Sequence, residues 1–311
     1  MKKLPFILCF VIAVIAACNS SKNKAPDFLI EDEVTYAADN SFQPIIDEVS
    51  TLFLGRHPEA GMHANYVSED SAIKLLMADS VRLAITTRPL SEREKYEIKK
   101  SHNVNESTIA YDAFALIVNP NNPDTLLYLD DIRGIISGRI TDWSQLAITS
   151  KKGKISLVFD QNGSSTVRYM QDSLNGGKPL KGNVYAQGSM MGVIETVKER
   201  EDIIGVVSTD WLRVAAGDSL TRENFRDLGV NVVLVKRDED QNYWRRPYQA
   251  YVLDGTYPLW RRVYAISTYT RRNSMISLFY YFLKGDAQRV ICRSSQLLPI
   301  NQVQVRQVVN N

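Results

Sequence analysis

The sequence predicts an α/β fold, and three consecutive segments of the chain carry this prediction. In each segment, a run of residues typical of a strand leads through a polar turn into a helical pattern. The expected strands are residues 33–38, 63–67 and 81–86, and the helices that follow them are 42–53, 72–77 and 91–100. A repeated order of strand, turn and helix is typical of a parallel sheet with helical crossovers. Polar residues in such turns collect at the carboxyl ends of the strands, where ligands bind.

The remainder of the chain continues this alternation. A long apolar run, residues 109–118, has the pattern of a buried strand and ends in the turn signal Asn119-Pro120. Further strands are expected at residues 155–159, 203–207 and 263–269, and further helices at 129–136, around Tyr169 and Leu174, after Ser189 and at 276–283. No internal repeat or low-complexity segment is visible.

Length and composition allow a large hydrophobic core. The chain has 311 residues, of which 44% are hydrophobic, and this length is sufficient for two lobes. It carries 37 lysines and arginines against 35 aspartates and glutamates. Because there is no basic excess, we expect no nucleic-acid partner.

The first residues carry an export signal. Two lysines precede an apolar run, residues 4–17, that is too short to span a bilayer but suits a secretory signal. Small residues directly before Cys18 resemble a bacterial lipobox. This resemblance implies a signal peptide of residues 1–17, a lipid on Cys18 and a tether of residues 18–29. A plain signal peptide, cut just before an incidental cysteine, is the alternative.

The turn after the expected strand at residues 155–159 combines a glycine with hydroxyl side chains. Gly163 can adopt a positive φ at little cost, and Ser164, Ser165 and Thr166 follow it at the start of the next helix. Such residues cap free backbone N–H groups, and the helix dipole favours an anion at this end. The turn is either an ordinary helix cap or part of an anion site. Its place in a series of similar polar turns favours the anion site.

An ordered series of short motifs resembles the PstS-like family, the phosphate-binding proteins of bacterial ABC transporters. In chain order the motifs are Ser41-Phe42, Thr86-Thr87-Arg88-Pro89-Leu90, Val118-Asn119-Pro120, Gly138-Arg139-Ile140-Thr141-Asp142-Trp143, Gly163-Ser164-Ser165-Thr166, Ile203-Ile204-Gly205-Val206-Val207, Tyr257-Pro258-Leu259 and Gln288. Each motif is weak alone, but together they span most of the chain that remains after export.

The resemblance implies a type II periplasmic binding protein fold. In this α/β fold two lobes are joined by two crossing strands and enclose a central cleft, and the first lobe is discontinuous. The crossing strands are expected near residues 109–118 and 248–252. Lobe 1 then comprises residues 30–115 and 248–311, and lobe 2 comprises residues 116–247.

The resemblance also implies a set of ligand contacts. Ser41 falls at the family's first hydroxyl position, and the hydroxyl turn covers its Ser-Gly-Thr anion turn, with Ser165 in place of glycine. The candidate ligand-binding residues are Ser41, Phe42, Glu69, Ser71, Thr87, Arg88, Asp160, Gly163, Ser164, Ser165 and Thr166.

Three of these positions depart from the family pattern. Glu69 falls where the family usually has serine, Thr87 where phosphate-specific members have aspartate, and Asp160 where they have arginine. A carboxylate about 4 Å from a bound anion would repel it by roughly 4 kcal/mol at an effective dielectric constant near 20. One hypothesis is that Asp160 accepts the proton of a monohydrogen oxyanion while Arg88 or Arg168 supplies positive charge. The other is that the site has lost tight phosphate binding.

Other motifs favour structural roles. Ser71 and Lys74 match the S-x-x-K spacing of penicillin-recognising enzymes, but the partner elements of those enzymes are absent. The pairs Arg245-Arg246 and Arg261-Arg262 are expected to be solvated. No catalytic constellation, cofactor fingerprint or metal-ligand spacing is present in the sequence.

The sequence therefore predicts a lipid-anchored solute-binding protein that faces the periplasm and is not an enzyme. We expect it to capture phosphate or a similar oxyanion and to deliver it to an ABC transporter permease, as a monomer and without a cofactor. A transporter-independent binding or signalling module on the same scaffold is the first alternative. A hydrolase is the second.

Overall fold

The computed structural model describes residues 34–59, 61–150, 153–217, 225, 228–238, 240–268 and 274–301. The expected signal peptide, the tether and Cys18 lie outside the described residues. None of the described helices is long and apolar enough to cross a membrane.

The described strands form one large mixed sheet and one small one. They are β1 (Val34–Asp39), β2 (Met62–Val67), β3 (Leu83–Thr86), β4 (Asn105–Val118), β5 (Leu126–Tyr128), β6 (Ser156–Phe159), β7 (Val184–Ala186), β8 (Ile203–Ser208), β9 (Asn231–Val232), β10 (Leu234–Lys236), β11 (Trp260–Ser267) and β12 (Leu298–Pro299). The large sheet has the order β2-β1-β3-β11-β4-β8-β6-β7, with β9 and β12 also paired to β4, and β5 pairs with β10.

The helices alternate with these strands along the chain. They are α2 (Gln43–Arg56), α3 (Glu69–Met77), α4 (Glu92–Lys99), α5 (Leu129–Ser137), α6 (Ser165–Tyr169), α7 (Met190–Glu199), α8 (Thr209–Ala215), α9 (Gln249–Leu253), α10 (Met275–Lys284) and α11 (Ala287–Ser294). Single turns are η1 (Asn40–Phe42), η2 (Trp143–Gln145) and the π-helical turn η3 (Met170–Leu174), which continues α6.

The predicted strand–turn–helix units are confirmed. β1 pairs in parallel with both β2 and β3, which makes β1–α2, β2–α3 and β3–α4 successive units of one sheet. Serine side chains accept a backbone N–H at the start of several of the helices, as expected for residues that satisfy the free donors of a first turn. The capping residues are Ser68, Ser91, Ser164, Ser189 and Ser274.

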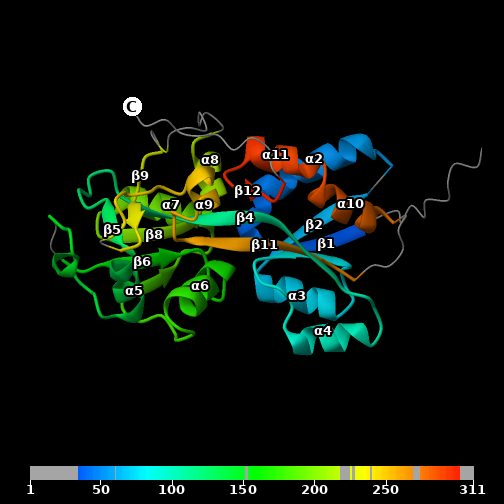
Figure 1. Ribbon diagram of the computed structural model, residues 1–311, viewed down its shortest axis with the longest axis horizontal. Helices are drawn as coiled ribbons and strands as arrows, with labels where there is room; N and C mark the ends of the chain where they lie inside the picture. The colour runs from blue at the N-terminus through cyan, green and yellow to red at the C-terminus, as the bar shows by residue number, and fades with distance from the viewer. Residues whose placement is uncertain are drawn as a thin grey trace, which may run out of the picture.

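The first lobe has helices on both faces of its part of the sheet. Figure 1 shows α2, α10 and α11 above β1 and β2, and α3 and α4 below them. Successive side chains of a strand point to opposite faces of the sheet, so neighbouring residues pack against different helices. Tyr36 and Ala38 of β1 pack in the core with α2 and α10, whereas Ala37 packs in the core with α3.

The second lobe repeats this three-layer arrangement. Its part of the sheet contains β6, β7, β8 and the end of β4, with α5 and α6 on one face and α7 and α8 on the other. Within β4, Leu116 packs in the core formed with α5, and the adjacent Ile117 packs in the core formed with α7.

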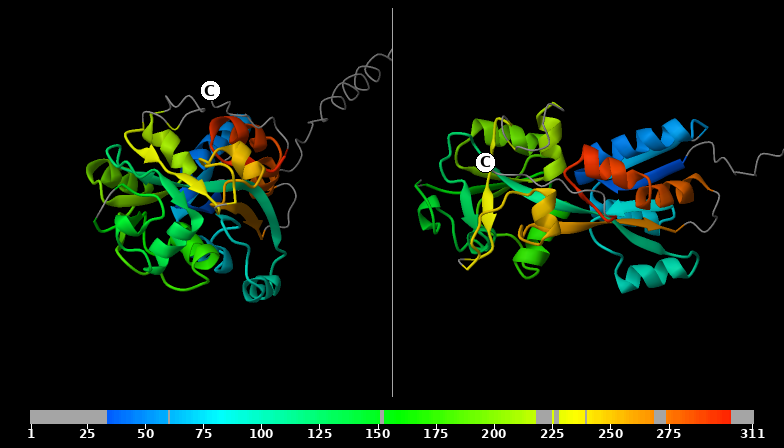
Figure 2. Two further views of the ribbon diagram at one scale, coloured as in Figure 1. Left: turned by 60° about the vertical axis from the view of Figure 1, so that its left-hand side comes forward. Right: turned by 45° about the horizontal axis from the view of Figure 1, so that its top comes forward.

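Two antiparallel strands, β4 and β11, run between the lobes. Residues 105–113 of β4 pair with β11, and residues 114–118 continue alongside β8 in the second lobe. The right-hand view of Figure 2 shows the two lobes side by side with these strands between them. The first lobe is discontinuous, because its cores combine residues 34–110 with residues 263–297.

The predicted crossing strand at residues 248–252 is wrong. Gln249–Leu253 forms helix α9, and Tyr248 and Val252 pack in the cores of the second lobe. The family resemblance placed the crossing here, without a strand pattern in these residues. The second crossing strand is β11, and we propose that the second lobe extends to its start, beyond the predicted limit at residue 247.

Candidate functional site

The first lobe places three polar side chains at the ends of its parallel strands. Asp39 is the last residue of β1, Glu69 is the first residue of α3 after β2, and Thr87 directly follows β3. They are 2%, 1% and 6% exposed, respectively. Because parallel strands end at the same edge of their sheet, the fold gathers these groups in one place.

The second lobe contributes the hydroxyl turn between β6 and α6. Gly163 has a φ of 71° with open space around it, so its role is to turn the backbone. The Ser164 hydroxyl accepts the N–H of Val167 (3.3 Å) and donates to Asp160 Oδ1 (2.7 Å). Ser164 is therefore the helix cap, and the buried Ser165 and Thr166 are available for other contacts.

Ser165 connects the two lobes. Its hydroxyl donates to Asp39 Oδ1 (3.0 Å) and lies 3.3 Å from the hydroxyl oxygen of Ser41. The backbone N–H of Ser41 donates to the same Asp39 oxygen (2.9 Å), and Trp211 of α8 donates its indole N–H to the Ser41 carbonyl (3.0 Å). The candidate anion turn of one lobe thus contacts the first predicted hydroxyl position of the other.

Arg261 lies at the centre of this cluster, and the prediction that its side chain is solvated is wrong. It is 4% exposed, its Nη1 donates to Ser165 Oγ (2.7 Å), and its Nε donates to Asp112 Oδ2 (2.9 Å). The guanidinium carbon lies 4.3 Å from the ring centroid of Phe114 and 5.2 Å from that of Phe42. The Phe42 ring therefore contributes to the site as an apolar wall and a cation–π partner.

The alternation within β11 could have identified Arg261. Arg261, Val263 and Ala265 are buried, whereas Arg262 between them is exposed. In a strand, every second side chain shares a face, so Arg261 belongs to the same face as the two apolar residues. The pattern was hard to recognise because both the buried Arg261 and the exposed Arg262 are charged residues. Asp39 was also missed, although it ends a parallel strand.

A second link between the lobes joins Glu69, Thr87 and Arg168. Glu69 Oε1 accepts the backbone N–H (2.5 Å) and the hydroxyl (2.6 Å) of Thr87. Glu69 Oε2 accepts Arg168 Nε (2.5 Å), and Arg168 Nη2 donates to Thr87 Oγ1 (2.8 Å). The third nitrogen, Nη1, lies 3.3 Å from Asp172. Arg168, which was one of two arginines predicted to supply positive charge to a ligand, is thus paired with the protein carboxylates Glu69 and Asp172.

The pKa values of the buried carboxylates are shifted in different directions. Burial raises the pKa of Asp39, Asp112 and Asp160 above the ordinary value, although nearby hydrogen bonds oppose the shift. Burial would also raise the pKa of Glu69, but the charge of Arg168 and the hydrogen bonds from Thr87 and Arg168 outweigh it and lower the pKa. Among these four acids, Glu69 is the one whose pKa is lowered, which favours its charged form.

Two buried donors beside Ser165 have no hydrogen-bond partner in the described part of the chain. One is Nη2 of Arg261, whose Nη1 binds Ser165, and the other is the hydroxyl of Thr166. An unpaired buried polar group costs about 1–3 kcal/mol, more when it is charged. Such groups in a native fold require an explanation, and a bound ligand or water is a common one.

The remaining candidate residues lie outside this cluster of contacts. Arg88 forms a two-pronged ion pair with Glu94 (2.9 and 3.0 Å) and lies 3.7 Å from Asp70. The hydroxyl of Ser71 lies 2.9 Å from that of the helix cap Ser68. Both arrangements have a local structural explanation. The described residues contain no group of three metal-ligating side chains.

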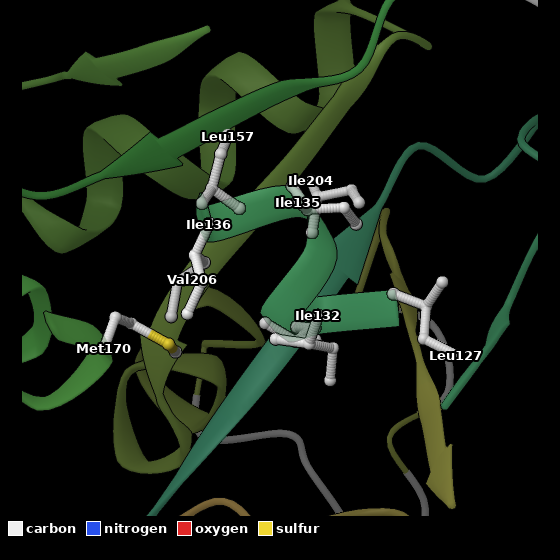
Figure 3. A pocket seen from close by; sticks show the side chains of 9 residues that line it. Leu127, Ile132, Ile135, Ile136, Leu157, Met170, Ile204 and Val206 are labelled. Carbon is white, nitrogen blue, oxygen red and sulfur yellow. The ribbon is translucent and has the colours of Figure 1, made fainter. Parts of the chain in front are cut away.

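An apolar cavity in the second lobe is separate from the site. It measures about 10 Å³ and is lined by aliphatic side chains and one methionine, among them Leu127, Ile132, Met170 and Val206 (Figure 3). This is about the space of one water molecule, with no polar partner to hold it. The cavity is a packing gap and offers no place for a polar ligand.

Comparisons with known proteins agree with this architecture. Residues 24–285 match the family model of the PBP superfamily domain. The phosphate-binding protein PstS of Bacillus subtilis is 21% identical over 324 residues, which cover 100% of this chain and 99% of that protein.

Solved structures share the fold at low identity. A substrate-binding protein from Clostridium perfringens, solved with bound phosphate, is 23% identical with a TM-score of 0.66, over 86% of this chain and 100% of that chain. An ABC-type phosphate transport receptor from Vibrio cholerae is 23% identical with a TM-score of 0.64, over the same shares. The chain has the two-lobed fold of type II periplasmic binding proteins and belongs to the PBP superfamily.

Proposed function

We propose that this protein captures phosphate or a similar oxyanion between its lobes and delivers it to an ABC transporter permease. The observation that carries the proposal is the cluster around Ser165. There a buried guanidinium with an unpaired donor, Arg261 Nη2, meets hydroxyls from both lobes, and the next residue in the chain, Thr166, has an unpaired buried hydroxyl. Groups of this kind are suited to an oxyanion, because they donate hydrogen bonds and supply positive charge.

The carboxylates of the cluster favour an oxyanion that carries a proton. Asp39 and Asp160 are buried and their pKa values are raised. A fully ionised anion such as sulfate would meet only repulsion from them when they are charged. A monohydrogen oxyanion could donate its proton to one of these carboxylates in a hydrogen bond. We propose Asp160 or Asp39 as this acceptor, with Ser41, Thr166 and Arg261 as donors.

A direct test is calorimetric titration of the purified protein without residues 1–17 (the exported domain) with phosphate, arsenate and sulfate. We expect heat with phosphate and arsenate and none with sulfate, since sulfate has no proton at neutral pH. Absence of heat with all three anions at millimolar concentration would contradict the proposed function.

The variant Thr166→Val tests the site itself. The Thr166 hydroxyl has no partner within the described residues, so its removal relieves an unpaired group and should leave the free protein equally or more stable. The stabilisation caused by phosphate in thermal unfolding should nevertheless fall. The matched control is Thr196→Val, because the Thr196 hydroxyl donates to the Gly192 carbonyl (2.7 Å) away from the site. The control should retain the phosphate effect.

The N-terminal signal leads us to propose lipid attachment at Cys18, which would hold a monomeric binding domain at a membrane, facing the periplasm. Labelling of cells with a radioactive fatty acid tests this attachment. The label should appear on the wild-type protein and disappear from Cys18→Ser. An unlabelled wild-type protein recovered in the soluble fraction would instead indicate a plain signal peptide.

One observation favours a second candidate function, a binding or signalling module that works without a transporter. Glu69 carries negative charge into the site and engages Arg168, which would weaken the binding of a simple anion. Phosphate uptake in cells that lack the protein distinguishes the two candidates. Uptake should fall if the protein serves a transporter and should not change if it serves as a module.

A further inference from the structure

We propose that Glu69 is an internal carboxylate ligand of the site, which joins the lobes through donors that a bound oxyanion would use. It would act as a specificity residue, because a ligand must compete with it for Thr87 and Arg168. The part of this proposal that concerns ligand affinity rests on the proposed function. The part that concerns the link between the lobes does not.

The contacts of Glu69 have the form of an anion site. Both carboxylate oxygens are used: one accepts the N–H and hydroxyl of Thr87, and the other accepts Arg168 Nε, all at 2.5–2.6 Å. Hydrogen bonds to an ionised acceptor are shorter and about twice as strong as neutral ones. A backbone N–H, a hydroxyl and a guanidinium are also the donors with which proteins hold phosphate. The carboxylate thus takes the place of such an anion.

The link connects elements that are distant in the sequence. Glu69 begins α3 and Thr87 follows β3 in the first lobe, whereas Arg168 lies in α6 of the second. Arg168 Nη2 also donates to Thr87, so each of the three residues contacts the other two across the lobes. The Glu69 side chain is 2% exposed and that of Arg168 is 27% exposed. Solvent therefore screens this link less than the exposed ion pairs of the surface.

Glu69 takes up the positive charge of one of the two arginines that lie in the interlobe contacts. Arg168 and Arg261 are the guanidiniums that hydrogen-bond within the two interlobe clusters. Glu69 engages the first and Asp112 engages the second. An oxyanion that displaces Glu69 gains Arg168, but it leaves a buried carboxylate behind. The oxyanion therefore gains only the difference in free energy between its own contact with Arg168 and the Glu69–Arg168 contact that it replaces.

The test uses Glu69→Gln, which keeps the size of the side chain but removes its charge. The control is Asp70→Asn, the neighbouring acid, which is exposed. Small-angle X-ray scattering of the exported domain without added anion should show a larger radius of gyration for Glu69→Gln than for the wild type. Asp70→Asn should scatter like the wild type. Arg168→Gln cuts the same link from its more exposed side and should expand the protein similarly, so the test does not depend on one variant folding.

Titration with inorganic phosphate completes the test. Glu69→Gln should bind phosphate at least about tenfold tighter than the wild type, within the usual range of coupling between two binding events. Arg168→Gln should not, because it loses a donor. The proposal is overturned if both variants scatter like the wild type. If the variants expand but no protein binds phosphate, arsenate or sulfate, the link stands and the proposed function is wrong.

Discussion

Arg261 and Asp112 form a buried ion pair at directly opposite positions of the two crossing strands. They are partners in the antiparallel register of β11 and β4, with Nε and Oδ2 2.9 Å apart and side chains 3% and 0% exposed. Ser208 donates a further hydrogen bond to Asp112 (2.8 Å), and Arg261 extends to Ser165 (2.7 Å). The pair therefore holds the guanidinium at the meeting point of both lobes.

Replacement of Arg261 by methionine should destabilise the protein strongly. The change leaves Asp112 as an uncompensated buried carboxylate, which costs about 3–5 kcal/mol. Urea unfolding of Arg261→Met measures the loss, and the exposed neighbour Arg262 provides the control Arg262→Met, for which we expect a change within about 0.5 kcal/mol. The double variant Arg261→Met with Asp112→Asn should recover part of the stability. No recovery would mean that the ion pair is not the cause.

Asp210 should make the stability depend on pH between about 4 and 6. This residue of α8 is buried beside Arg213, and burial raises its pKa to about 6. The folded state therefore holds a proton that the unfolded state has already lost above pH 4, so the free energy of unfolding should fall as the pH rises to 6. The fall is about 2–3 kcal/mol at most.

The variant Asp210→Asn isolates this effect from the other acids. The difference in unfolding free energy between wild type and Asp210→Asn should change between pH 4 and 6 and stay constant from pH 7 to 8. Chemical denaturation at a series of pH values measures it. A difference that does not vary with pH would show that Asp210 titrates normally in the folded protein.

Gly205 should tolerate no side chain. A Cβ at this position of β8 would lie 2.7 Å from Val197 and 2.9 Å from both Ile117 and Val193. Overpacking of a well-packed core costs about 1–3 kcal/mol, so Gly205→Ala should lower the melting temperature. Gly55 near the end of α2 has open space around it. Gly55→Ala should stabilise the protein by up to about 1 kcal/mol, and equal effects of the two changes would contradict this account.

Trp211 should report the contact between the lobes. Its indole N–H donates to the Ser41 carbonyl across the site (3.0 Å). Separation of the lobes would expose the indole to water, so we expect the emission of this tryptophan to shift to longer wavelength in Glu69→Gln. The background variant Trp211→Phe, with and without Glu69→Gln, is the control. A shift that persists without Trp211 would come from another tryptophan.

Much of the fold could be predicted from local sequence. The βα units, the long strand β4 and the serine caps follow from periodicity and from the hydrogen-bonding chemistry of the turns. The turn at Gly163 was also predicted, because a glycine followed by hydroxyl residues is typical of the start of a helix. The crossing strand at residues 248–252 failed because the resemblance alone placed it there, whereas that segment forms helix α9.

The site itself depended on contacts that local patterns do not contain. Arg261 looked like a surface residue because its partner, Asp112, is 149 positions away. Glu69 could be placed near the site, but its partner Arg168 could be identified only when α3 and α6 were brought together.

The sequence by itself determined the alternation of strands and helices and the presence of a hydroxyl turn. These are properties of short segments, set by backbone sterics, side-chain period and turn chemistry. The tertiary structure decided which charges meet. Arg261 is buried against Asp112, and Glu69 is bound by Thr87 and Arg168, where the two lobes meet. Burial of a charge is costly unless partners are supplied, and here distant parts of the chain supply them.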